Sequence, residues 1–207
     1  MFLFVHLCVN GQVKEFEGEI QYRHLYRFAI KNLDTTAILK NYGASSNYYY
    51  KDGSYRWTFD SCIMAEEYYW PETGKTHNRA AGETEFKLNN STGYNKLLKY
   101  EVQENADTIC GYVCHRIVVA TASKSDKNDV LVRAIYYAPE LTVDPQHFKK
   151  YGSYCNYDIY KITKSAFLRI EMMSPFMPFA LRMEAVKVIP RSLAKSDVTL
   201  PENAVVK

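Results

Sequence analysis

The chain has 207 residues, of which 47% are hydrophobic and 24% are charged, and these values suit one soluble globular domain with a substantial core. The formal net charge is +3, and basic and acidic residues are interspersed along the chain. This pattern excludes the basic groove that nucleic-acid binding requires, so we expect no nucleic-acid partner.

The first residues, MFLFVHLCVNGQ, are apolar from Phe2 to Val9 but too few to span a membrane. They resemble the end of a hydrophobic export signal, although they lack its positively charged start. We expect residues 1–12 to be the remnant of such a signal; the alternative is a first strand at Phe2–Val9. Residues 13–207 would then form a single domain. Its cysteines number four, and this even count suits an oxidising compartment.

The first half of the chain alternates as antiparallel strands do. Between Val13 and Phe28, apolar residues alternate with glutamates, which predicts a strand with one buried and one wet face. A short helix is expected at Thr35–Asn41. Asp-Gly between two alternating aromatic segments predicts a hairpin at Ser46–Phe59. Two further strands are expected at Cys62–Trp70 and Lys75–Ala81.

Thr108–Ala120, TICGYVCHRIVVA, predicts a central strand rich in β-branched residues. A strand would hold the Cα atoms of Cys110 and Cys114 about 13 Å apart. A disulfide needs roughly 4.4–6.8 Å. We therefore expect a disulfide that joins Cys62 to Cys155 or involves Cys114. If the segment is instead a tight turn, Cys110 and Cys114 can pair directly.

The second half continues the strand pattern. Tyr94–Glu104 begins either as a short helix or as a strand, and Pro139–Tyr151 is expected to be partly helical, with Asp144 as its cap. Further strands are expected at Val130–Tyr137, Phe167–Met173 and Phe179–Ile189. The total of nine or ten strands without βαβ alternation predicts a mainly β fold of the α+β class.

No catalytic or metal-binding motif is evident in the sequence. Glu66 and Glu67 are adjacent, so a strand would point them to opposite faces, where they cannot share one proton. In a strand, His115 points away from Cys110 and Cys114, and no second Cys/His pair follows at zinc-finger spacing. We expect no metal, no cofactor and no enzymatic activity, with an uncharacterised hydrolase built from sequence-distant residues as an alternative.

Four motifs in a fixed order give the chain a family likeness over most of residues 15–207. It resembles exported bacterial proteins of unassigned function that are related in fold to the lipoprotein carriers LolA and LolB. The motifs are Gly18-Glu19-Ile20-Gln21-Tyr22, Gly111-Tyr112-Val113-Cys114-His115-Arg116-Ile117, Tyr136-Tyr137-Ala138-Pro139-Glu140-Leu141 and Leu200-Pro201-Glu202-Asn203-Ala204-Val205-Val206.

The resemblance implies a strongly curved antiparallel sheet, an incomplete barrel that wraps one or two short helices. In the carriers, the concave face of this sheet holds acyl chains. The Gly-Leu-Pro-Gly-Leu-Ile motif of a related secreted family is absent here. No position matches a functional residue of the carriers, so the resemblance assigns no site residue.

A loop near the end of the chain is the candidate ligand contact. Its two prolines, Pro175 and Pro178, prevent regular structure, and its large apolar side chains are costly on a loop unless something covers them. The functional interpretation is a flap over an apolar groove; the alternative is a loop packed onto the core. The candidate residues are Met172, Met173, Phe176, Met177 and Phe179.

Two functional hypotheses follow from these expectations. The first is an exported protein, in the periplasm or at the outer membrane of a Gram-negative bacterium, that binds a lipid, an acyl chain or a lipoprotein in a curved sheet. The second is a cell-envelope structural or interaction protein that uses a sheet face or edge to bind another protein. The paired tyrosines can either line a pocket or divide between the core and the surface.

Overall fold

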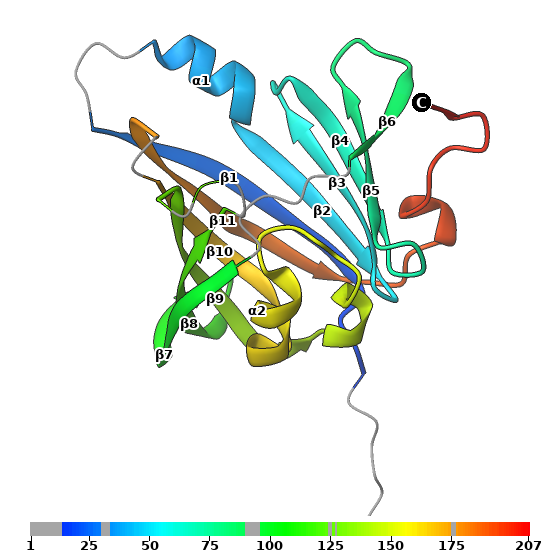
Figure 1. Cartoon of the computed structure of the whole chain (residues 1–207). Coiled ribbons are helices and arrows are strands. Elements are labelled where there is room, and N and C mark those ends of the chain that lie inside the picture. Colours follow the sequence, from blue (N-terminus) through cyan, green and yellow to red (C-terminus); the bar gives the residue numbers. More distant parts are fainter. Residues whose placement is uncertain (1–13, 30–33, 90–95, 124–125, 127, 175–176) are drawn as a thin grey trace, which may run out of the picture.

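The computed structural model describes residues 14–29, 34–89, 96–123, 126, 128–174 and 177–207. They form one open sheet of twelve strands in the order β12-β6-β5-β4-β3-β2-β1-β11-β10-β9-β8-β7 (Figure 1). The strands are β1 (Gly18–Phe28), β2 (Ser45–Lys51), β3 (Ser54–Asp60), β4 (Met64–Trp70), β5 (Lys75–Ala80), β6 (Glu85–Asn89), β7 (Lys96–Ile109), β8 (Tyr112–Ala122), β9 (Val130–Thr142), β10 (Ser165–Met173), β11 (Phe179–Pro190) and β12 (Val205–Val206).

The sheet is antiparallel except where β12 pairs in parallel with β6. The predicted mainly β class is therefore confirmed, although the structure has more strands than the sequence indicated. The hairpin predicted at Asp52-Gly53 is present, because both residues have positive φ values, 47° and 79°, and Lys51 pairs with Ser54.

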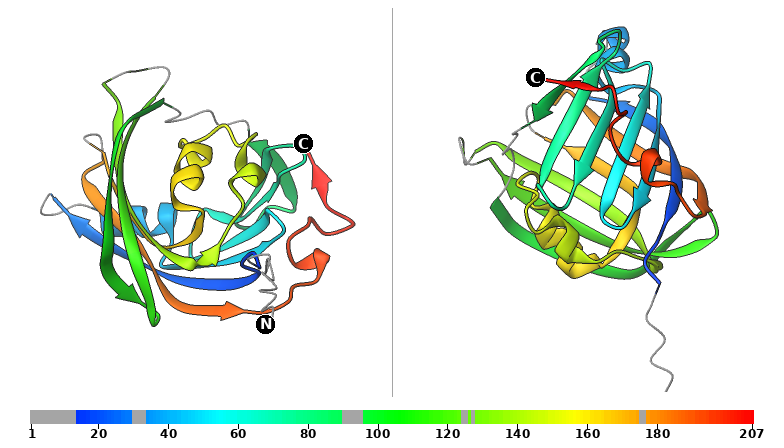
Figure 2. Two further views of the ribbon diagram at one scale, coloured as in Figure 1. Left: turned by 90° about the horizontal axis from the view of Figure 1, so that it is seen from below. Right: turned by 90° about the vertical axis from the view of Figure 1, so that its right-hand side faces the viewer.

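The sheet curves strongly around a small helical layer (Figure 2). That layer consists of the 3₁₀ turn η1 (Pro145–Phe148) and the helix α2 (Asn156–Thr163). The other α-helix, α1 (Thr35–Tyr42), connects β1 to β2 at one end of the sheet, and a second 3₁₀ turn, η2 (Lys195–Asp197), lies near the C-terminus. No helix among the described residues has both the length and the apolar character needed to cross a membrane.

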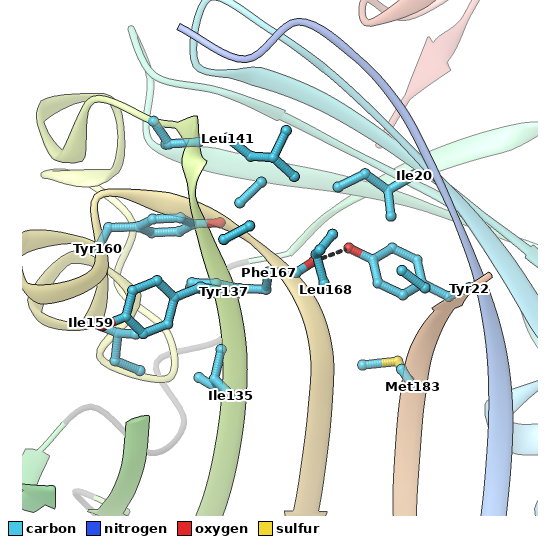
Figure 3. Close-up of a cluster of buried hydrophobic side chains, with 14 of the residues drawn as sticks. Ile20, Tyr22, Ile135, Tyr137, Leu141, Ile159, Tyr160, Phe167, Leu168 and Met183 are labelled. Carbon is cyan, nitrogen blue, oxygen red and sulfur yellow. Dashed lines mark hydrogen bonds between the residues drawn. The ribbon is translucent and has the colours of Figure 1, made fainter. Parts of the chain in front are cut away.

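Part of the concave face is tightly filled where α2 covers it. Ile135, Ile159 and Leu168 are completely buried there. The Tyr160 ring stacks on Phe167 at a centroid distance of 4.6 Å, and Figure 3 shows both rings within this cluster. The Tyr22 hydroxyl donates a hydrogen bond of 2.6 Å to the Phe167 carbonyl, so the polar tip of this buried tyrosine is satisfied.

The single strand predicted at Thr108–Ala120 is wrong. A tight turn at Cys110-Gly111 divides the segment into the end of β7 and the start of β8, with φ values of 52° and 85°. The pairing of Ile109 with Tyr112 closes this two-residue hairpin. Two-residue hairpins of this kind usually carry Asn-Gly or Asp-Gly, so a cysteine in the first position hides the turn from sequence patterns.

The predicted disulfide is not observed, because Cys62, Cys110, Cys114 and Cys155 form no disulfide bond with one another. The Cys62 thiol donates to the Asn41 carbonyl at 3.0 Å, and the Cys110 thiol donates to the Ala185 carbonyl at 3.3 Å. Burial raises the pKa of each of these four thiols, which keeps them protonated and poorly nucleophilic. The predicted export signal at residues 1–12 lies outside the described residues.

Helix α2 was missed by the sequence analysis. The N-cap residue of this helix, Cys155, has a left-handed backbone conformation, and its side chain makes no capping hydrogen bond. The Ser, Thr, Asp or Asn that usually marks the start of a helix is therefore absent. Strand β9 also extends beyond the predicted end, through Pro139, to Thr142. The predicted cap at Asp144 is present, and its carboxylate accepts from the Gln146 amide at 2.9 Å.

Candidate ligand cavity

A cavity of about 400 Å³ lies against the concave face of the sheet, next to the filled region. Its walls come from the inner faces of β1 to β6 and of β9 to β11, from the end of α1, and from the segment that runs from η1 into α2. The sheet supplies most of the wall because its curvature turns one face of many strands toward a common centre (Figure 2). The volume falls within the range of ordinary small-molecule sites.

One wall of the cavity is aromatic. Tyr48 on β2 lies directly opposite Trp57 on β3, and their ring centroids are 5.5 Å apart. Tyr55 on β3 lies 5.2 Å from Tyr48 by the same measure. Because residues two apart on a strand share a face, the alternating aromatics of the β2–β3 hairpin all turn inward.

Another wall is aliphatic and sulfur-containing. Ile170 on β10 pairs with Met183 on β11, and Met172 pairs with Leu181. All four residues line the cavity. Methionine side chains adapt to irregular apolar partners, so this wall suits a ligand without a rigid shape.

Glu67 on β4 brings a carboxyl group into the cavity. Its Oε1 accepts a 2.6 Å hydrogen bond from the Tyr55 hydroxyl. Burial raises the pKa of Glu67 above its ordinary value, even though hydrogen bonds from Tyr55 and Asn78 act in the opposite direction. The carboxyl group is therefore unusually easy to protonate.

Arg133 on β9 brings a guanidinium into the same cavity and is only 5% exposed. Its Nη1 donates to Asn156 Oδ1 at 3.3 Å, and its Nη2 donates to the Tyr154 carbonyl. Burial lowers the pKa of Arg133 to about 10, so the side chain still carries its charge at neutral pH.

Several buried polar atoms in the cavity wall lack a hydrogen-bond partner among the described residues. They are Trp57 Nε1, Asn78 Oδ1 and Arg133 Nε. Buried polar atoms in proteins nearly always have a hydrogen-bond partner. Three unpaired atoms around one cavity therefore indicate that a bound molecule or water supplies the missing hydrogen bonds.

The candidate residues of the predicted flap are placed differently from one another. Met172 lines the cavity, whereas Met173 is 56% exposed. Met177 packs against the core, and Phe179 is buried at the start of β11. Phe176 lies outside the described residues. Of the four candidates that the structure describes, only Met172 borders the cavity.

Sequence reasoning missed the two charged cavity residues. A signal for Arg133 was available, because Leu131, Arg133, Ile135 and Tyr137 alternate in one strand and the other three are apolar or aromatic. An arginine on such a face is either at a boundary or functional. The opposite orientation of Glu66 and Glu67 was predicted correctly: Glu66 pairs with Arg79 at 2.7 Å on the other face.

Neither a metal centre nor a known relative explains this cavity. No group of three or more histidine, cysteine or acidic residues in the described part of the chain is arranged to hold a metal ion. His115 instead accepts a 3.0 Å hydrogen bond from the Asn105 amide. A scan against protein-family models and a search of curated proteins both found no match to this chain.

Proposed function

We propose that this chain is a non-enzymatic binding protein that shelters a lipid, an acyl chain or the acyl segment of a lipoprotein in the cavity of its curved sheet. The observation that carries the proposal is the 400 Å³ cavity between an aromatic and an aliphatic wall. Burial of each methylene group in such walls is worth roughly 0.8 kcal/mol. Several methylene groups are therefore enough for useful affinity.

The likeness to the LolA and LolB carriers supports the same proposal. In those carriers an incomplete barrel wraps short helices and holds acyl chains on its concave face, and the curved sheet of this chain is compatible with the same use. The proposal includes an exported location, in the periplasm or at the outer membrane of a Gram-negative bacterium. It also includes a hydrophobic ligand in place of a cofactor or nucleic acid.

Two adjacent residues of β10 provide a matched test. Met172 lines the cavity, whereas Met173 points away from it and is 56% exposed. Met172→Trp should fill the cavity and weaken binding of the neutral fluorescent probe N-phenyl-1-naphthylamine by at least about tenfold, which corresponds to losing about two methylene contacts. Met173→Trp should leave binding unchanged. Equal binding by both variants and by the wild type would contradict the proposal.

Native mass spectrometry of protein purified from its own cell envelope identifies the natural ligand. We expect the native protein to carry the extra mass of a bound lipid, and we expect denaturation to release that lipid. Protein that carries no lipid and does not bind the probe would remove the carrier interpretation.

A second candidate function is an envelope interaction protein that binds a partner at its sheet edge. The observation in its favour is β7, a 14-residue strand at the end of the sheet order. Tyr100 and Val102 on this strand are 54% and 42% exposed. Long exposed edges can pair with strands of other proteins. A photo-crosslinking residue at Val102 should then give a discrete product in cells, and one at the exposed Val186 should not.

A further inference from the structure

The charge of Arg133 has no counter-ion in the structure. No carboxylate lies within ion-pair distance of it, and every aspartate and glutamate of the chain belongs to the described residues. A guanidinium has five N–H donors, and only Nη1 and Nη2 of Arg133 have partners among the described residues. A buried charge without a partner is costly for a protein to keep.

The sheet register directs this side chain into the cavity. Arg133 on β9 lies directly opposite Met172 on β10, and Met172 lies opposite Leu181 on β11. Opposed residues in an antiparallel sheet share a face, so all three point to the concave side. The guanidinium therefore lies beside the aliphatic wall, where the apolar part of a ligand would lie.

Glu67 does not neutralise Arg133. The two side chains line the same cavity, but no ion pair joins them, and Glu67 already has hydrogen-bond donors in Tyr55 and Asn78. Arg133 is held from the other side by the Tyr154 carbonyl and lies 5.5 Å from the centroid of the Tyr154 ring. Arg133 thus brings a fixed positive charge to the cavity wall, and no carboxylate of the described residues forms an ion pair with it.

We propose that Arg133 binds the anionic oxygen head group of an amphiphile, such as the carboxylate of a fatty acid, whose apolar part lies along the Met172 and Leu181 wall. This inference rests on the proposed function, because it requires an apolar ligand in the cavity. A planar guanidinium matches the two oxygens of a carboxylate, which adds geometric selectivity to the attraction of charge.

The test compares three probes that share one chain and differ in head group: dodecanoate, dodecan-1-ol and dodecylamine. Each competes with N-phenyl-1-naphthylamine at pH 7.5. For the wild type we expect dodecanoate to bind at least about tenfold more tightly than dodecan-1-ol, because hydrogen bonds to charged groups are the strong ones. Dodecylamine should bind most weakly.

Arg133→Gln should remove the preference for dodecanoate and leave binding of dodecan-1-ol unchanged. Arg182→Gln is the matched control, because Arg182 lies on β11 in the same sheet, pairs with Glu171 at 2.8 Å and does not line the cavity. That variant should keep the wild-type ranking. If Arg133→Gln does not fold, the wild-type ranking of the three probes decides alone.

The outcomes separate the two proposals. If no probe binds, the proposed function fails and this inference fails with it. If dodecanoate and dodecan-1-ol bind equally to the wild type, or if dodecylamine binds most tightly, Arg133 is not an anion site although the cavity still binds apolar ligands. If Arg133→Gln binds both dodecanoate and dodecan-1-ol as the wild type does, the inference is likewise overturned.

Discussion

The concave face of the sheet has a filled part and a hollow part. In the filled part, under α2, Ile135, Ile159 and Leu168 are completely buried, and the Tyr160 ring stacks on Phe167. In the hollow part the walls combine aromatic rings with Glu67 and Arg133. The same sheet and the same inward alternation build both parts. Strand pattern alone therefore does not decide which inward residues become core, because residues of α2 also line the hollow part.

The largest test of this difference uses two residues on β10. Leu168→Ala should cost about 3 kcal/mol of unfolding free energy, because Leu168 is completely buried and truncation leaves a void. Met172→Ala should cost less, about 2 kcal/mol or below, because Met172 is only partly buried and already borders a cavity. Urea unfolding measures both values. Equal costs would mean that the cavity is packed in solution.

Two glycines in hairpin turns allow a second comparison. Gly53 lies against the 3₁₀ turn η1, whereas Gly82 has open space around it. A Cβ atom at Gly53 would lie 2.3 Å from His147 Cγ of η1, whereas one at Gly82 would have no atom within 4 Å. Both glycines have positive φ values, +79° and +82°. Gly82→Ala should therefore cost about 1 kcal/mol for backbone strain alone. Gly53→Ala should cost about 2 kcal/mol or more because the clash adds to that strain, as measured by thermal unfolding.

The contact between His147 of η1 and Glu15 should make the free energy of unfolding depend on pH. His147 Nε2 lies 3.1 Å from Glu15 Oε2, and this contact raises the pKa of His147. Burial acts to raise the pKa of Glu15, but hydrogen bonds from His147, Tyr50 and the Asp144 amide outweigh it and lower that pKa.

The sign of each shift defines the pH window. A raised histidine pKa stabilises the fold at low pH, and this contribution is lost as pH rises through the folded-state value. A lowered glutamate pKa stabilises it at higher pH, and this contribution is lost as pH falls through the folded-state value. Both contributions are present between the ordinary values of 4.5 and 6.5.

His147→Gln should therefore cost about 1 kcal/mol near pH 5.5, and less as pH rises above neutrality. Urea unfolding at a series of pH values measures the cost. Glu15→Gln is the control, since it should remove the same pH dependence. A cost that does not change with pH would contradict an ion pair.

The smallest expected effect is at the N-terminus of helix α1. The Asp34 carboxylate caps this helix by accepting from the Thr36 and Ala37 amides at 3.0 and 3.1 Å. Asp34→Ala should cost about 0.5 kcal/mol of unfolding free energy. Asp34→Ser keeps a capping oxygen and should cost less. Hydrogen exchange at the Thr36 and Ala37 amides is the sensitive measurement, and unchanged exchange in the alanine variant would rule out the cap.

Local sequence patterns were enough for the mainly β class and for most strands. Alternation located β1 and β11 to within a few residues, because one face of each strand is more buried than the other. Asp52-Gly53 identified its hairpin because few other dipeptides adopt the required backbone conformation. The Cys110-Gly111 hairpin was missed because cysteine gives no such signal.

The sequence by itself determined which residues alternate and therefore which side chains share a face. It placed Arg133 in an apolar strand, but it gave no reason to pair that residue with Met172 or to set both in one cavity with Glu67. Arg133 and Met172 meet because β9 and β10 pair directly, whereas Glu67 on the distant strand β4 reaches the same cavity because the sheet curves. The hollow was decided by tertiary structure alone, because a cavity is the space that the covering helix leaves unfilled and has no residues of its own in the sequence.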